Sequence, residues 1–201
     1  MWKPNLLPDF PRSHRMIFAF SVFMLIYSVA MGYGAWTTDP AAAKETIEQV
    51  INGKFSTIIQ QMANAGWWGQ TIIIFTNNLT ASLLIIACGA LLPFLPLLMG
   101  VIPNGLIIGL MAGFYESESI LQKSTFFLSL LPHGLFELPA IVLSATVGMI
   151  WGGRNWRSIL KGGNFGALGA HAKASLAFLP LIFALLLVAA MVEVLVTPAL
   201  M

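Results

Sequence analysis

Residues 16–35 read MIFAFSVFMLIYSVAMGYGA and contain no charged side chain. A helix rises about 1.5 Å per residue, so about 20 apolar residues cross the hydrocarbon core of a bilayer. The stretch therefore predicts a membrane-spanning helix. A cleaved signal peptide is the competing interpretation, since Ser28-Val29-Ala30 has the small residues of a cleavage site.

The composition extends this prediction to the whole chain. Of its 201 residues, 58% are hydrophobic and only 9% are charged, with a mean hydropathy of +0.84. These values exclude a water-soluble domain and predict an all-α, polytopic transmembrane helix bundle. We expect one integral membrane domain over residues 1–201, with about five spans near 16–35, 71–92, 97–114, 124–150 and 174–196.

The segment 41–66 differs from the spans because polar residues alternate with apolar ones at helical spacing. It predicts an amphipathic helix outside the membrane, interrupted near Asn52-Gly53. Trp67-Trp68 then marks the return to the headgroup level, which tryptophan prefers. The helix could lie on the bilayer or on the bundle, or it could offer a docking surface for a partner. Its apolar stripe comprises Ile47, Val50, Ile51, Phe55, Ile58, Ile59 and Met62.

Prolines predict broken helices in the second half of the chain, because proline removes a backbone donor. We expect a tight apolar turn from Pro93 to Pro96 and a bend near Pro103. Residues 124–150 exceed the length of one span, which favours a short segment ending near Leu131 and a new helix starting at Pro132. The next loop would then extend over residues 152–173.

Five polar residues lie within or beside the predicted spans. His133 and Glu137 are four residues apart and share one face of a helix. A charged side chain at the centre of a bilayer costs about 2.5–3.5 kcal/mol on insertion scales, so it normally faces protein or water. We therefore predict a polar intramembrane cluster, structural or binding in role, formed by Asn77, Asn78, Asn104, His133 and Glu137.

Enzymatic chemistry finds little support in the sequence. No pair of histidines has the spacing of a zinc protease, no GxSxG occurs, and Asp9 and Asp39 lie outside the predicted spans. Cys88, the single cysteine, cannot form an internal disulfide. No basic patch interleaves with aromatic residues as in nucleic-acid binding. We expect no catalytic residue, metal or cofactor, and no nucleic-acid partner.

The basic residues predict the orientation. Seven of the ten lysines and arginines fall in the leader and in the loop 152–173, and the positive-inside rule places these segments in the cytoplasm. The N-terminus of this multi-pass protein would then be cytoplasmic and its C-terminus outside the cell membrane. The seven are Lys3, Arg12, Arg15, Arg154, Arg157, Lys161 and Lys173.

The order of short polar motifs resembles the stage II sporulation protein M family of integral membrane proteins. The motifs are Asn77-Asn78, then Asn104-Gly105 with Gly109, then Pro132-His133-Gly134 with Glu137 and Ala140, over residues 77–148. The resemblance implies a membrane anchor, since the family's namesake assembles with peptidoglycan-degrading partners during engulfment in spore-forming bacteria.

Two functions follow as hypotheses. The first is a non-enzymatic scaffold that holds partner proteins at the membrane. The alternative is a small-solute or ion transporter or channel, with a polar site around His133 and Glu137. The expected partners are the lipid bilayer and either other membrane proteins or a second copy of the chain.

Overall fold

The structure, a computed structural model, describes residues 12–162, 172 and 175–197. Within these ranges the regular structure is helical, which confirms the predicted all-α class. The helices are α1 (Arg12–Thr38), α2 (Pro40–Val50), the π-helix η1 (Ile51–Phe55), α3 (Ser56–Met62), α4 (Trp67–Leu91), the π-helix η2 (Leu97–Val101), α5 (Ile102–Ser117), α6 (Lys123–Leu160) and α8 (Leu179–Leu195).

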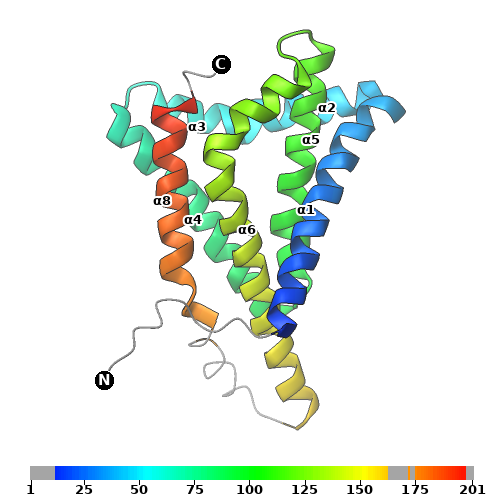
Figure 1. Cartoon of the computed structure of the whole chain (residues 1–201), viewed down its shortest axis with the longest axis vertical. Helices are drawn as coiled ribbons and strands as arrows, with labels where there is room; N and C mark the ends of the chain where they lie inside the picture. Colours follow the sequence, from blue (N-terminus) through cyan, green and yellow to red (C-terminus); the bar gives the residue numbers. More distant parts are fainter. Residues whose placement is uncertain (1–11, 163–171, 173–174, 198–201) are drawn as a thin grey trace.

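Four stretches are long and apolar enough to cross a membrane: His14–Thr38, Trp67–Leu91, Leu97–Ser117 and Lys123–Leu160. The apolar helix Leu179–Leu195 is shorter, at 17 residues. Figure 1 shows these helices as one bundle, with α2 and α3 lying across one end of it. We call this end, which also holds the end of α1 and the start of α6, the layer end.

Helix α6 is the central element of the bundle. It packs against α1, α4, α5 and α8, and every residue from Ala140 to Gly148 is buried. A helix that is buried on all sides is largely apolar, and the two hydroxyl residues of this segment, Ser144 and Thr146, donate to carbonyl oxygens of α6 itself. Two apolar clusters meet on it, one shared with α1, α4 and η2 and the other shared with α4 and α8.

Glycines bring two pairs of helices into close contact. On the α1–α5 seam, a Cβ at Gly105 would lie 2.6 Å from Ser28 Cβ, and one at Gly109 would overlap the backbone of Val29. On the α4–α6 seam, Gly89 and Gly152 approach each other in the same way. Without a hydrophobic driving force in lipid, such close packing is a main source of helix association.

The predicted break before Pro132 is wrong. Helix α6 runs without interruption over 38 residues, with Pro132 and Pro139 inside it, and changes direction near its beginning (Figure 1). A proline costs the helix one backbone hydrogen bond, which neighbouring helices and local adjustment offset in membrane proteins. His133 and Glu137 therefore lie in the interior of α6 and not in the first turn of a helix that begins at Pro132.

The other predicted turns and loops agree with the structure only in part. A turn joins α4 to η2 at Leu92–Phe94, as the prolines predicted, and Pro103 lies in the first turn of α5. The amphipathic segment changes to a π-helix at Asn52-Gly53, where we expected an interruption. The predicted loop 152–173 is wrong up to Leu160, because α6 continues that far. The rest of that loop lies largely outside the described residues.

Candidate functional site

His133 and Glu137 face helix α8. His133 is half-buried, and its Nδ1 lies 3.1 Å from Oγ1 of Thr197, which is buried just beyond the end of α8. One turn further along α6, the carboxyl group of Glu137 lies within electrostatic reach of Glu193 on α8. The pair that the sequence singled out thus meets two further polar residues, and α8 supplies both.

This arrangement brings together two carboxyl groups that are both half-buried. Carboxylates that share a site repel each other, and a shared proton or cation relieves the repulsion. The geometry is therefore suited either to fastening α6 to α8 or to holding a small positive charge. Within the ranges that the structure describes, no group of three or more histidine, cysteine, aspartate or glutamate side chains could hold a metal ion.

Glu193 and Thr197 were not among the predicted site residues. Glu193 is the one charged residue in an otherwise apolar helix, and this was the signal that could have found it. Thr197 gave no comparable signal, since threonine is common in apolar segments. Its contact with His133 depends on how α8 packs against α6.

The three asparagines make local hydrogen bonds. Asn77 Nδ2 donates to Asn78 Oδ1 at 3.0 Å within α4, and Asn104 Nδ2 donates to the carbonyl oxygen of Gly100, one turn earlier, at 2.7 Å. Asn77 also lines a groove on α4. Convergence of all five predicted residues in one cluster stays a prediction.

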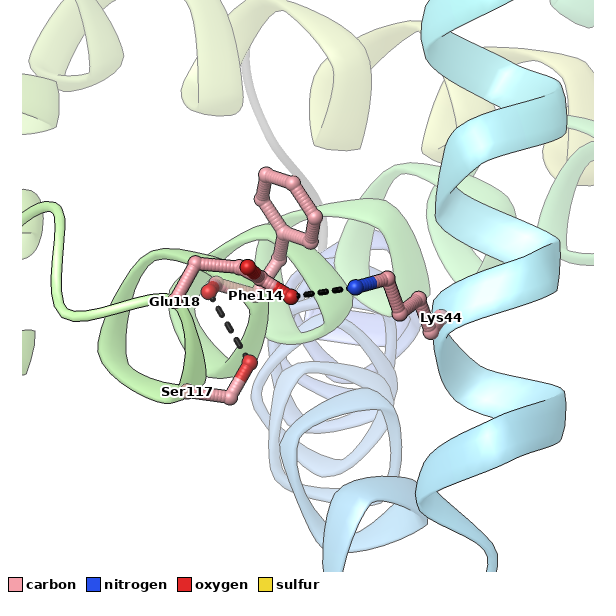
Figure 2. Close-up of polar contacts among 4 residues, drawn as sticks. All are labelled: Lys44, Phe114, Ser117 and Glu118. Atoms are coloured by element: carbon pink, nitrogen blue, oxygen red, sulfur yellow. Dashed lines mark hydrogen bonds and ion pairs between the residues drawn. The ribbon is translucent and has the colours of Figure 1, made fainter.

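A polar network ties the layer end together. Lys44 on α2 forms a 2.6 Å ion pair with Glu118, which follows α5, and Ser117 donates to the carbonyl oxygen of Phe114 beside it (Figure 2). The hydrogen bond and the negative charge of Glu118 raise the pKa of Lys44 above its usual value, so the ammonium group stays charged at neutral pH.

A second group of contacts extends this network to α1 and α6. The hydroxyl of Tyr33 donates to the Glu116 carboxylate, and Lys123 Nζ lies 3.1 Å from the same hydroxyl. The ammonium group also lies 4.6 Å from the centre of the Tyr33 ring, within the range of a cation–π contact. Four helices are thus connected at the layer end.

A groove of about 580 Å³ lies between α3 and α4. Helix α3 contributes Thr57, Ile58 and Gln61, and α4 contributes residues on the face from Ile73 to Leu84. Polar residues on both walls make it different from a gap between lipid-facing helices.

The opposite end of the bundle is basic. His14 at the start of α1 lies 3.4 Å from Arg154 near the end of α6, and Trp156 donates to the carbonyl oxygen of Leu91 at 2.7 Å. Arg157 lies in the last turn of α6, and Lys161 follows it. Five of the seven described acidic residues belong to the layer end, together with three lysines. The five are Asp39, Glu45, Glu48, Glu116 and Glu118.

Comparison with known families matched the family model described as stage II sporulation protein M, over residues 16–198. Comparison with curated proteins and with solved structures gave no match.

Proposed function

The chain belongs to the stage II sporulation protein M family, and on that premise we propose that it is a non-enzymatic assembly protein that holds partner proteins at the membrane. It is a multi-pass membrane protein, as its apolar helices indicate. A role in sporulation is not part of the proposal.

The observation that carries the proposal is the difference between α2 and α3. Helix α2 uses its apolar stripe on the bundle, where Ala43 and Ile47 are buried with Leu110 of α5. Helix α3 has no buried residue, and Ile59 is 62% exposed. An apolar side chain that is left exposed on the layer is available for contact with a partner protein.

The polar network at the layer end supports this reading. Lys44 fixes α2 to Glu118, so the layer is held at its α2 half, and α3 continues from it to a contact with α4. A rigid attachment reduces the ordering cost that a partner must offset on binding. We place this layer outside the cell membrane and the basic end in the cytoplasm, because the positive-inside rule favours that orientation.

The second candidate function is transport of a proton or small cation. It is favoured by the placement of two half-buried carboxyl groups, Glu137 on α6 and Glu193 on α8, in helices that pack against each other. Intramembrane carboxyl groups often mark ion or proton pathways. The assembly role remains our preference because the same pair also suits the fastening of two helices.

Site-specific photocrosslinking tests the assembly role. We would place a photoreactive residue at Ile59 on α3 and, as a control, at Met99, which is 64% exposed in η2. In native membranes we expect discrete adducts with another protein from position 59 and none of these from position 99. The same adducts from both positions, or no protein adduct from position 59, would contradict the proposal.

A further inference from the structure

The groove between α3 and α4 has both polar and apolar residues in its lining. It is formed where α3 passes along the layer end and the spanning helix α4 leads away from it. The stacked rings of Trp67 and Trp68 lie at the start of α4, at a level that suits the lipid headgroups. The groove therefore reaches from the headgroup level into the hydrocarbon region.

The hydrogen-bonding groups in the groove are neutral and rich in acceptors. The hydroxyls of Thr57 and Thr76 donate to carbonyl oxygens of their own helices, so their oxygen lone pairs are left to accept. Asn77 uses one amide hydrogen on Asn78, which leaves its other hydrogen and its carbonyl oxygen. Among the described residues the lining holds no charged side chain. Such a surface is complementary to several hydroxyl groups without charge.

The deeper part of the groove is apolar. Ala81 and Leu84 follow the polar residues along α4, one turn and more below Asn77. A ligand that matches both parts has a hydroxyl-bearing head and a hydrocarbon chain. A lipid molecule in the bilayer has the same order, with a polar head followed by apolar chains.

The size of the groove suits a small molecule, since about 580 Å³ lies in the range of sites for small ligands. The lining from Ile73 to Leu84 extends over about 16 Å of helix, so an occupant that fills the groove is elongated along α4.

We propose that this groove binds a neutral, hydroxyl-bearing lipid such as a sugar-headed diacylglycerol, with the head between α3 and Asn77 and a chain along Leu84. The inference does not depend on the assembly role. A bound lipid of this kind would fill the space beneath α3 and support the layer from below.

Native mass spectrometry of the full chain tests the proposal. The protein would be released from nanodiscs that contain equal amounts of digalactosyl diacylglycerol and phosphatidylcholine with identical acyl chains. We expect the wild type to retain the galactolipid over phosphatidylcholine by about tenfold, which corresponds to one or two well-formed hydrogen bonds. Asn77→Leu should reduce this preference to near unity, and Thr80→Val should reduce it in part.

The matched control is Asn52→Leu, since Asn52 is an exposed asparagine in η1 outside the groove, and it should keep the preference. If Asn77→Leu loses its helical circular dichroism, Thr80→Val decides the result. Equal retention of both lipids by the wild type would overturn the proposal. So would an unchanged preference in the folded groove variants, or a two-chain species that Asn77→Leu dissociates.

Discussion

Hydroxyl side chains inside the bundle are mostly satisfied by their own helix. Most of them donate to a carbonyl oxygen three or four residues earlier, and these bonds require no partner helix. His133 and Glu137 differ, because their interactions with Thr197 and Glu193 reach across to α8. At the scale of single residues, these two connect α6 with α8, as Trp156 connects α6 with α4. The self-bonded hydroxyls include Ser21, Ser28, Ser144 and Thr146.

Glu137→Gln separates the two candidate functions. The amide keeps most of the hydrogen-bonding capacity and removes the repulsion with Glu193, so thermal stability should be unchanged or higher. Glu137→Leu should lower the melting temperature, because it removes the polar group altogether. We would measure melting temperature together with proton and cation flux in proteoliposomes.

The assembly role predicts no flux in the wild type or in either variant. Glu45→Gln, which alters an exposed carboxylate on α2, is the matched control. Wild-type flux that disappears in a stable Glu137→Gln protein, and persists in Glu45→Gln, would reverse our preference for assembly over transport.

At the scale of helices, glycines line two of the helix–helix contacts, one between α1 and α5 and one between α4 and α6. Gly109 on α5 and Gly152 on α6 each lie where a side chain would collide with the backbone of a neighbouring helix. Collisions with backbone cannot be relieved by a change of rotamer. The glycines therefore set the distance between the helices and, through it, the position of the layer on α1 and α5.

Gly109→Val should open the α1–α5 seam. Overpacking of this kind costs about 1–3 kcal/mol of unfolding free energy, which a denaturant titration in detergent micelles would measure. Gly34→Val is the control on the same pair of helices, since a Cβ at Gly34 meets nothing within 4 Å. Equal losses in the two variants would mean that helix propensity, and not the seam, is responsible.

The sequence predicted those helices that depend on their own residues and not on packing against other helices. Length and hydropathy located the long apolar helices, whereas the interruption expected at Asn52-Gly53 is a π-helix that continues from α2 into α3. The prediction failed at Pro132, because a proline ends a helix or is tolerated depending on the neighbours that support it. For the same reason the sequence identified Glu137 as a site residue but not its proximity to Glu193, which only the packing of α8 on α6 creates.

At the scale of the whole molecule, charge separates the two ends of the bundle. Acidic residues gather at the layer end, and basic residues from α1 and α6 gather at the other. The positive-inside rule assigns the basic end to the cytoplasm. Helix α3 would then meet partners outside the cell membrane.

Cysteine labelling tests this orientation in a Cys88→Ala background. Ile120→Cys, in the exposed turn after α5, should react with a membrane-impermeant reagent in intact cells. Leu160→Cys, 78% exposed at the end of α6, should react only after permeabilisation. Labelling with the opposite sidedness would invert the topology and place the layer in the cytoplasm.

The central claim is that the chain works within an assembly that α3 holds together. The most direct measurement is the mass of the complex extracted from native membranes in polymer-bounded nanodiscs, for the wild type, Ile59→Asp and the control Met99→Asp, all checked for folding. We predict that the wild type and Met99→Asp carry an additional protein beyond the 21.8 kDa chain, and that Ile59→Asp loses it. Recovery of the wild type only as the single chain or its multiples, or retention of the partner by Ile59→Asp, would contradict the account.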